Sequence, residues 1–505
     1  MRQIVGILGT PVDVLNTEAV LARVEQFIRE RRFHQIATAN TDFLINALED
    51  PELLHILRNA DLVIPDGMPL LWASRLMRSP LPERVTGADL VPQLAALSAA
   101  NGYRIFMLGA RPQVAALARE RLLAKHPGLQ IVGCVSPPVA ALVDMDHEGL
   151  LEQIRIARPD VLLVAFGNPK QEKWIHMNRQ QLADVPVCIG VGGTFDFIAG
   201  QTARAPQWMQ KSGLEWVHRL LQDPARLCRR YSRDLGHFSR HLLRQWLAMR
   251  GQVFTGGTEI QTAVVGDFTV ISILGDLSGR TVPQVQAASE QALEAHTELI
   301  FDLQHVSAID GEGLGMLINM PKRAASYHLR VRLACVPAFL ARILKCSQLV
   351  DGPYHIAPTL ARAFTSPGYR GLAWHVRCGA DAALVEVRGD ADTESVSRLE
   401  NVCAKLLSGG RRVDLDLREV SYSGLALLGA LCRLASARTG GPEVRLVVCD
   451  ELRGLLRREK AESRFTVIGA PELPADAVEH PGGVLDRRDI YVPEALQRGP
   501  FAEKK

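Results

Sequence analysis

The sequence predicts an α/β protein with a mostly parallel sheet, followed by two smaller α/β domains. From residue 3 to residue 191, short apolar runs alternate with amphipathic helical patterns. This alternation is typical of a parallel sheet covered by helices on both faces. A basic segment and a glycine-rich linker follow, and beyond the linker one order of strands and helices occurs twice. A length of 505 residues fits about three domains.

The first region is expected to form a Rossmann-like sheet within residues 1–200. Its strands are predicted at residues 3–8, 35–39, 62–64, 104–108, 130–134, 160–166 and 187–191. Helices are predicted between them, for example at 18–31, 51–59 and 112–125. Asp50 and Pro51 are a suitable N-cap and first residue for the second of these helices.

The composition is that of an ordinary globular protein, with 47% hydrophobic and 22% charged residues. The nine cysteines include no C-x-x-C pair, which disfavours a zinc site or a disulfide framework and suits a reducing cytoplasm. No signal-peptide pattern and no run of ~18 apolar residues occurs. Any membrane contact is therefore expected to be peripheral.

The segment from residue 61 to residue 89 contains the clearest candidate for chemistry. A short strand ends at Asp66, beside Gly67, which we expect to allow a sharp turn. The loop after the next helix returns Arg84 and Thr86. An acid at a strand end with a cation and a hydroxyl beside it is typical of a site at a sheet edge. The alternative is that Asp66 only caps the helix that begins at Met68.

Three more strands end in glycine followed by polar residues. Gly109, Gly167 and the pair Gly192-Gly193 occupy these positions. Such exits favour a nucleotide or another phosphate ligand, whereas the alternative is tight turning alone. Neither the dinucleotide-binding fingerprint nor a P-loop is present, which disfavours a nicotinamide dehydrogenase and a P-loop NTPase.

Residues 201–250 combine many arginines with tryptophans and leucines at helical spacing. This pattern favours an amphipathic appendage at a membrane surface. A nucleic-acid site is disfavoured because the aromatic residues are too apolar and too helically spaced for base stacking. A solvated face over an ordinary core helix is the other alternative. Arg219, Arg226 and Arg229 share one helical face, an arrangement that suits a diphosphate.

The duplicated domains are predicted at residues 259–356 and 372–470, after a linker at 251–258. Each has the order strand, helix, strand, turn, helix, strand. The two turns read Asp310-Gly-Glu312-Gly-Leu and Ser421-Tyr-Ser423-Gly-Leu. The tail at 474–505 is rich in Pro, Asp and Arg and is expected to be poorly ordered.

Residues 3 to about 246 resemble the WecG/TagA/CpsF glycosyltransferase family in a long ordered series of segments. These include Thr38-Ala-Asn40-Thr-Asp-Phe, Ala60-Asp-Leu-Val-Ile-Pro-Asp66-Gly67, Leu81-Pro-Glu-Arg84-Val-Thr-Gly87-Ala-Asp89, Phe106-Met-Leu-Gly109, Phe166-Gly-Asn-Pro-Lys170-Gln171-Glu172-Lys-Trp174, Gly190-Val-Gly-Gly-Thr-Phe-Asp196 and Pro224-x-Arg226-x-x-Arg229.

The resemblance implies an inverting, metal-independent transferase that needs no cofactor and uses a UDP-sugar. It implies an acceptor saccharide on undecaprenyl diphosphate, at the cytoplasmic face of the inner membrane, in surface or exopolysaccharide synthesis. The transferred sugar would be N-acetylmannosamine, its uronic acid, or glucose. The appendage would complete the site at the membrane, and self-association is common in the family.

Inversion needs a general base for the acceptor hydroxyl, and Asp66 matches the base that the family implies. Thr38 and Asn40 are expected to bind the sugar or the acceptor, and Arg84 and Gln171 to line the pocket. Charge on the departing UDP calls for arginines and glycine-loop N–H groups. The substrate-binding residues implied in addition are Gly109, Lys170, Gly192, Gly193 and Asp196, with Arg219, Arg226 and Arg229 at the lipid diphosphate. Two Asp-x-Asp matches, Asp144-Met-Asp146 and Asp414-Leu-Asp416, are short enough to arise by chance and are assigned no metal.

Each duplicated domain resembles the STAS family in its element order and its turn. In that family a Ser or Thr of the turn is often phosphorylated to release a partner. Glu312 occupies this position in the first copy, and Ser423 lies in the turn of the second copy. We expect these domains to bind a protein partner rather than to act as a phosphorylation switch.

Two other functions compete with the enzyme. One is a regulatory scaffold that acts through the STAS-like domains, with a degenerate transferase region. The retained Asp66, Thr38, Asn40, Arg84 and Gln171 favour the enzyme over this scaffold. The other, a lipid or nucleic-acid binder acting through the basic segment, leaves the strand-end motifs unexplained.

Overall fold

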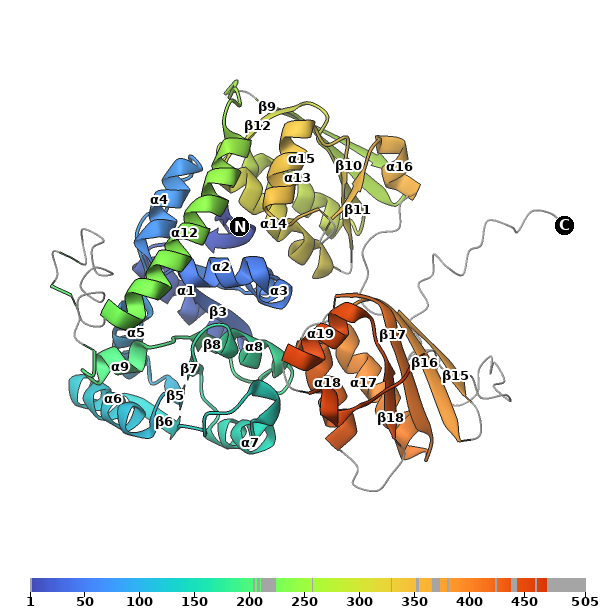
Figure 1. Ribbon diagram of the computed structural model, residues 1–505. Coiled ribbons are helices and arrows are strands. Elements are labelled where there is room, and N and C mark those ends of the chain that lie inside the picture. The colour runs from blue at the N-terminus through green and yellow to red at the C-terminus, as the bar shows by residue number, and fades with distance from the viewer. Residues whose placement is uncertain are drawn as a thin grey trace. The chain divides into compact units, whose positions relative to one another are not determined.

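The computed structural model describes residues 2–202, 205–206, 209, 224–256, 258–327, 329–350, 354–365, 373–378, 381–391, 393–422, 425–436, 443–458 and 461–469. The chain forms two compact units (Figure 1). The first contains residues 1–138 and 146–368, and the second contains residues 139–145 and 369–505. The tail expected at 474–505 lies outside the described residues.

The central sheet of the first unit has six strands, all parallel, as the sequence predicts. Its order is β4-β3-β8-β7-β5-β6. The strands are β3 (His34–Ala39), β4 (Leu62–Pro65), β5 (Arg104–Gly109), β6 (Gln130–Val135), β7 (Val161–Ala165) and β8 (Val187–Gly190).

Residues 3–8 differ from the prediction because they do not join this sheet. They form β1 (Ile4–Ile7), which pairs antiparallel with β2 (Thr10–Asp13) in a separate hairpin. Leu8 and Gly9 connect the two strands with φ of 50° and 80°. Two consecutive residues with positive φ form the tight turn whose twist matches a two-stranded hairpin.

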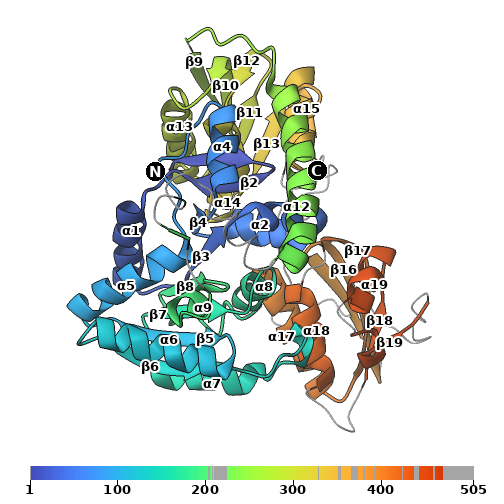
Figure 2. The same ribbon diagram turned by 60° about the vertical axis from the view of Figure 1, so that its left-hand side comes forward.

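Helices cover both faces of the central sheet, and strand residues alternate between the two cores. Ile36 of β3 packs with α1, α5, α6 and α9, whereas the adjacent Ala37 packs with α2, α3, α4 and the hairpin. Figure 2 shows this layering. The helices are α1 (Thr17–Glu30), α2 (Thr41–Glu49), α3 (Pro51–Asn59), α4 (Met68–Leu76), α5 (Gly87–Asn101), α6 (Pro112–Lys125), α7 (His147–Ala157), α8 (Lys170–Met177) and α9 (Thr194–Ile198).

The basic segment contains the long helix α12 (Pro224–Met249). Phe238 of α12 is buried in the core that contains α2 and the hairpin. Gln245 is also buried, where its Oε1 accepts from the Leu8 N–H at 2.9 Å and its Nε2 donates to the Gly6 carbonyl oxygen. The carboxyl-terminal half of α12 therefore packs against the core, which agrees with the alternative of a solvated face over an ordinary core helix. For the rest of the segment, membrane contact stays a prediction.

The second sheet lies in the same unit and has the order β12-β10-β11-β13-β14, with β9 antiparallel to β10. Its strands are β9 (Thr258–Val265), β10 (Phe268–Leu277), β11 (Glu298–Asp302), β12 (Val306–Ile309), β13 (Val331–Ala334) and β14 (His355–Ala357). Its helices are α13 (Val282–Glu294), α14 (Gly311–Ala325), α15 (Ala338–Cys346) and α16 (Leu360–Thr365).

The second unit repeats this arrangement, which confirms the predicted duplication. Its sheet has the order β15-β16-β17-β18-β19, with only β15 antiparallel to its neighbour. The elements are β15 (Ala373–Cys378), β16 (Ala382–Asp390), α17 (Thr393–Ser408), β17 (Arg412–Tyr422), α18 (Leu425–Ser436), β18 (Val444–Val447), α19 (Asp450–Arg458) and β19 (Thr466–Val467). Within the described part of the chain, no helix is both long enough and apolar enough to span a bilayer.

Candidate active site

The carboxyl edge of the central sheet has a switch point between β5 and β7. The chain leaves β5 toward β6 on one side, and it leaves β7 toward β8 on the other. Adjacent parallel strands whose connections diverge leave a crevice, and ligands of α/β proteins bind there. Gly109 ends β5 and Gly167 follows β7, so two of the predicted glycine exits flank this switch point.

Asp66 and Arg84 lie on neighbouring segments at this edge. Asp66 directly follows β4, and its N–H donates to the Ala39 carbonyl oxygen at 2.7 Å. The Val85 N–H donates to the Pro65 carbonyl oxygen at 2.9 Å, which holds the returning loop beside the end of β4. Both Asp66 and Arg84 are half-buried. The backbone bond therefore places the loop that carries Arg84 beside the strand end that carries Asp66, and the pairing of their side chains stays a prediction.

Asp66 does not occupy the N-cap position of α4, which the capping alternative would require. The N-cap is Gly67, which makes no side-chain capping hydrogen bond. Gly67 has an extended backbone with φ of 166°, so the sharp turn expected from this glycine does not occur. Thr86 is the N-cap of α5, and its hydroxyl accepts from the Asp89 N–H at 3.1 Å and donates to the Asp89 carboxylate at 2.7 Å.

Thr38 and Asn40 both make structural hydrogen bonds at the same edge. The buried Thr38 hydroxyl donates to the Gly190 carbonyl oxygen at 2.8 Å, which joins the ends of β3 and β8. Asn40 is the N-cap of α2, and its Oδ1 accepts from the Phe43 N–H at 3.2 Å. Within the described part of the chain its amide nitrogen makes no hydrogen bond, so this end of the side chain is the one left for a ligand.

Gln171 is fully buried and connects two of the glycine exits. Its Oε1 accepts from the Gly167 N–H at 3.1 Å and from the Gly192 N–H at 3.0 Å. Its Nε2 donates to Glu172 at 2.8 Å. Gln171 thus positions the two loops instead of lining the pocket with its polar atoms. The N–H groups of Gly167 and Gly192, which we expected to meet a phosphate, are already used.

Glu172 belongs to a buried polar network that the sequence analysis assigned no role. Its carboxylate accepts from Gln171 Nε2 and from Asn168 Nδ2, and Asn168 Oδ1 accepts from Asn46 Nδ2 at 2.7 Å. Burial raises the pKa of Glu172 to about 7, although these hydrogen bonds oppose the shift. Residues Gln171 to Met177 are all buried despite their polar sequence, so hydropathy gives no signal for this network.

The glycine positions differ in what they require. At Gly109, with φ of 104°, a Cβ would lie 2.7 Å from the Ala165 carbonyl oxygen, so a side chain is excluded. Gly167 and Gly192 also have positive φ, but the space beside each is open. Gly193 has φ of −75° and needs no glycine geometry. The open space beside Gly167 and Gly192 is where a ligand can approach the backbone.

Two charged residues predicted to bind substrate have partners at this edge. Asp196 of α9 accepts from Arg111, which precedes α6, at 3.3 Å. The Lys170 ammonium lies 5.4 Å from the centre of the Phe166 ring, and burial lowers its pKa. Arg219 and Ser423 lie outside the described residues. Arg226 and Arg229 fall within α12, and their side chains are not described.

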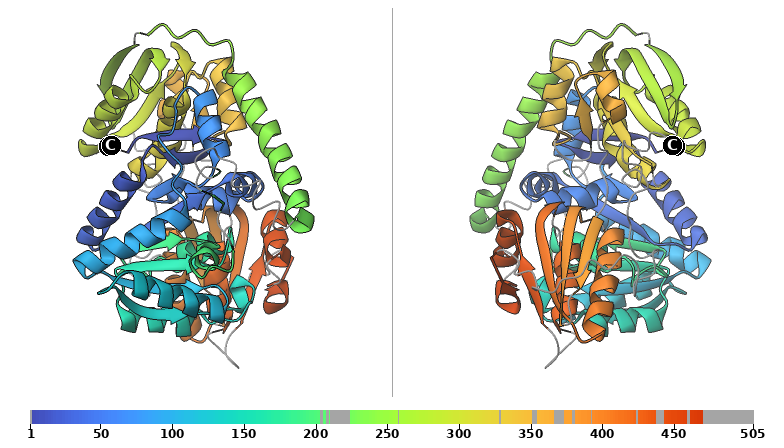
Figure 3. Two further views of the ribbon diagram at one scale, coloured as in Figure 1. Left: turned by 90° about the vertical axis from the view of Figure 1, so that its left-hand side faces the viewer. Right: turned by 90° about the vertical axis from the view of Figure 1, so that its right-hand side faces the viewer.

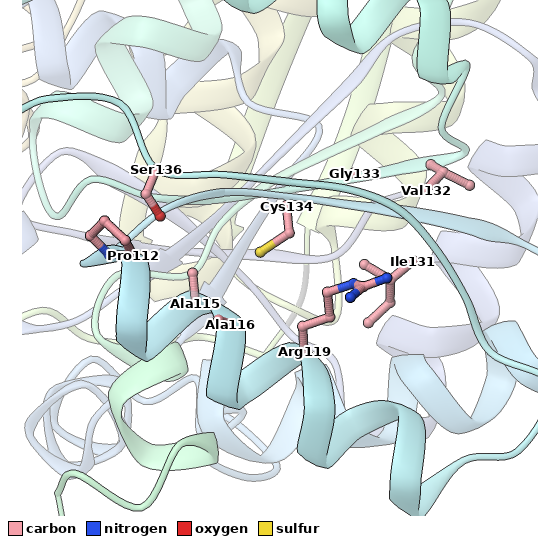
Figure 4. A pocket seen from close by; sticks show the side chains of 9 residues that line it. All are labelled: Pro112, Ala115, Ala116, Arg119, Ile131, Val132, Gly133, Cys134 and Ser136. Carbon is pink, nitrogen blue, oxygen red and sulfur yellow. The ribbon is translucent and has the colours of Figure 1, made fainter.

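A cavity of about 490 Å³ lies between α6 and β6 (Figure 4). Its lining includes Arg119, Cys134 and Ser136. The Ser136 hydroxyl donates to the Gly109 carbonyl oxygen at 3.2 Å, so the cavity begins one strand beyond the switch point. None of the predicted site residues lines it, and we do not assign it to the site around Asp66.

The Asp-x-Asp segments are engaged elsewhere. Asp414 pairs with Arg445 at 2.7 Å and Asp416 pairs with Arg418 at 2.6 Å, both on β17 or beside it. Asp146 caps α7 by accepting from the Gly149 N–H at 2.9 Å. Within the described residues, no group of three or more His, Cys, Asp or Glu side chains is arranged to hold a metal ion.

Two family models match the chain. The model described as "Glycosyl transferase WecG/TagA/CpsF family" matches residues 5–252, and the model described as "Mlab, STAS domain" matches residues 260–352. The chain is similar to N-acetylglucosaminyldiphosphoundecaprenol N-acetyl-beta-D-mannosaminyltransferase of Bacillus subtilis (strain 168), with 34% identity over 191 residues, or 38% of this chain and 72% of that protein. The protein of the same name from Staphylococcus aureus (strain MW2) is 28% identical over 227 residues, or 45% of this chain and 87% of that protein.

Two solved structures are similar to a smaller part of the chain. An anti-sigma factor antagonist from Thermotoga maritima has 19% identity and a TM-score of 0.19, and the match covers 21% of this chain and 92% of that one. The anti-sigma factor antagonist SpoIIAA in its unphosphorylated form has 20% identity and a TM-score of 0.19, with 22% and 96% covered.

Proposed function

The chain belongs to the WecG/TagA/CpsF glycosyltransferase family, and from this premise we propose that it transfers a hexose derivative from a UDP-sugar to a saccharide on undecaprenyl diphosphate. The names of the relatives specify an N-acetylglucosaminyl acceptor and N-acetylmannosamine as the transferred sugar. We propose a sugar of this type, its uronic acid or glucose, in bacterial surface or exopolysaccharide synthesis. The observation that carries the proposal is Asp66 beside the Arg84 loop at the sheet edge.

In the proposed reaction, Asp66 is the general base. The acceptor hydroxyl oxygen attacks the anomeric carbon from the face opposite UDP, and its proton passes to the Asp66 carboxylate. The bond between the anomeric carbon and the UDP oxygen breaks, so the configuration inverts. Proton transfer to a positioned carboxylate contributes typically ~10²–10⁴-fold to rate.

The charge of the departing UDP is assigned to cationic side chains, because the Gly167 and Gly192 N–H groups are already bound to Gln171. Lys170 and Arg84 are the candidates at the sheet edge, and Arg219, Arg226 and Arg229 are proposed for the lipid diphosphate. Fixed cations aimed at developing negative charge stabilise a transition state without reorganisation. The proposal assigns no metal ion to this step.

We also propose that the protein acts as a peripheral enzyme at the cytoplasmic face of the inner membrane. In support, α4 begins two residues after Asp66 and presents Trp72 and Leu76, which are 47% and 42% exposed. Exposed tryptophan and leucine beside arginine are typical of a surface that enters the lipid headgroup region. The appendage at 201–250 would complete this contact. The STAS-like domains, at 259–356 and 372–470, are proposed to make protein contacts.

The test is UDP release from a panel of UDP-sugars with a short-chain lipid-diphosphate N-acetylglucosamine acceptor. Asp66→Asn should lower kcat about 10²–10⁴-fold with little change in KM for the UDP-sugar. The exposed Asp184 gives a matched control, because Asp184→Asn makes the same chemical change away from the site. If wild type and Asp66→Asn are equally inactive with every donor, a regulatory scaffold becomes the better proposal.

A further inference from the structure

Helix α14 of the STAS domain at residues 260–352 packs closely against β1 of the hairpin (Figure 3). A Cβ at Gly315 of α14 would lie 2.2 Å from the Ile4 carbonyl oxygen. A Cβ at Gly6 of β1 would lie 2.8 Å from the Ile318 and Leu314 side chains. Only glycine permits two backbones to approach this closely. The STAS domain and the hairpin are therefore in contact too close to admit a Cβ at Gly315 or at Gly6.

The amino-terminal end of α14 contacts the chain directly after α4. The Gly311 N–H donates to the Met77 carbonyl oxygen at 2.9 Å, and the Glu312 N–H donates to the Ser79 hydroxyl oxygen at 3.0 Å. The Glu312 carboxylate accepts from Gln3 Nε2 at 2.8 Å. The domain that we expected to bind a separate protein thus contacts the transferase part of the same chain through this end of α14.

The carboxyl-terminal part of α14 contacts the chain directly before β4. Lys322 Nζ donates to the Ala60 carbonyl oxygen and to the Asp61 carboxylate, both at 3.0 Å. One helix therefore holds the chain at Asp61 and again at Met77 and Ser79. The segment between these points consists of β4, Asp66 and α4.

The loop after α15 adds a second set of contacts on the same side of the hairpin. Arg58 of α3, which is half-buried, donates to the Ser347 carbonyl oxygen at 2.8 Å. Gln348 donates from Nε2 to the Leu48 carbonyl oxygen at 3.0 Å. These bonds hold the domain at a second place, separate from the α14 contact.

We propose that this STAS domain is a positioning element of the active site, in which α14 holds both ends of the segment that carries Asp66. The partner of this α14 face is then the transferase part of the same chain. The inference rests on the proposed function, because it assigns the reason for the contact to the placement of Asp66. A general base must lie within hydrogen-bond reach of the proton it removes, so a small shift of its segment reduces the rate steeply.

The experiment uses the full chain with Gly315→Ala and Gly454→Ala. The three heavy atoms nearest to a Cβ at residue 315 all belong to Ile4, whereas a Cβ at the exposed Gly454 of α19 has no heavy atom within 4 Å apart from its own helix. Both changes replace a helical glycine by alanine. Hydrogen exchange is measured for residues 61–79 and for the second sheet, and kcat and KM are measured for UDP release with the lipid-diphosphate acceptor.

For Gly315→Ala we expect faster exchange in residues 61–79, unchanged exchange in β10 and β11, and a fall in kcat of about tenfold or more. KM for the UDP-sugar should stay within about twofold, because the hydrogen bonds described for α14 lie at residues 60–61 and 77–79 and not at the glycine exits. Gly454→Ala should match wild type in every measurement. Ser79→Ala, which removes only one acceptor from the contact, should give a smaller fall in kcat with the same unchanged KM.

Two results would overturn the proposal: unchanged exchange in residues 61–79 in both interface variants, or faster exchange there with unchanged kcat. If β10 and β11 also exchange faster in Gly315→Ala, that change has destabilised the second sheet itself. The proposal is then judged on Ser79→Ala alone, by the same two results. If wild type releases no UDP with any donor, the proposed reaction fails. The exchange measurements then still show whether α14 holds the segment.

Discussion

The Lys322 ammonium group lies 3.0 Å from the Asp61 carboxylate, and this pair joins α14 to the start of β4. Burial lowers the pKa of Lys322 to about 8, even though Asp61 attracts the proton. The pKa of Asp61 is lowered, because Lys322 and the Gln35 N–H outweigh the effect of burial on that carboxyl. The pair is therefore charged at neutral pH, and it loses the lysine charge as the pH rises through about 8.

The coupling between these residues should depend on pH. In a double-mutant cycle with Lys322→Met and Asp61→Asn, we expect about 1–3 kcal/mol of coupling in the free energy of unfolding at pH 7. At pH 9.5 the coupling should be smaller, because folded Lys322 is then mostly neutral. Denaturant unfolding at both pH values measures it, and equal coupling at pH 7 and pH 9.5 would contradict the assignment.

Rising pH weakens the coupling between Lys322 and Asp61, but its effect on the overall free energy of unfolding has the opposite sign. Between about 8 and the ordinary value of 10.5, the unfolded lysine binds a proton that the folded one has lost. The unfolded state then binds more protons, so this group alone makes the free energy of unfolding rise with pH in that window. Lys322→Met should lack this rise.

The parallel sheet and the duplicated domains were predictable because their signals are local. Apolar runs, helical periodicity and glycine exits each occupy a few adjacent residues. The hairpin was missed because residues 4–7 have the same apolar character as a core strand, and only the positive φ at Leu8 and Gly9 sets them apart. The α14–β1 contact joins residues about three hundred positions apart. In the sequence this contact is marked only by Gly6, Gly311 and Gly315. Glycines at these positions could equally well belong to turns or to ordinary helices.

The strand-end position of the candidate residues was predictable, but the hydrogen-bond partners of each polar group were not. The strand ends place Asp66, Thr38 and Gly109 at one edge, because carboxyl ends of parallel strands meet there. The local partner of each polar group depends on loops that meet only in three dimensions. Gln171 could not be distinguished from a ligand-binding residue, because its two acceptor contacts come from loops on different strands.

Replacing Gln171 by methionine should loosen both glycine exits together. The change keeps the side-chain volume but removes the acceptor of the Gly167 and Gly192 N–H groups. A buried donor without a partner costs about 1–3 kcal/mol, so we expect a lower free energy of unfolding and weaker UDP-sugar binding. Calorimetric titration with UDP-sugar measures the second effect. Gln153→Met, at an exposed residue of α7, is the control, and equal affinities in the two variants would show that the loops do not need this link.

The pKa of Glu172 predicts a pH dependence of stability. Burial raises this pKa from its ordinary value of 4.5 to about 7, so between these values the folded state holds a proton that the unfolded state has released. The free energy of unfolding should therefore fall as the pH rises from about 4.5 to about 7 and level off above. Glu172→Gln should remove this component of the slope. Its denaturation midpoint, compared with wild type at pH 5, 6, 7 and 8, provides the test, and parallel curves would refute the raised pKa.

Gly192 and Gly193 provide a matched pair for locating the donor. Gly192 has φ of 52° beside open space, so an alanine there is strained but meets no atom of the protein. Left-handed backbone costs a non-glycine residue about 1–2 kcal/mol, and Gly192→Ala should lower stability by that order. Gly193 has φ of −75°, and its added Cβ would have only Asp196 Oδ2 nearby, at 3.9 Å, so Gly193→Ala should be close to neutral. If the donor fills the open space, Gly192→Ala should also raise KM for UDP-sugar about tenfold or more by steric exclusion. A stability loss with unchanged KM would place the donor elsewhere along the edge.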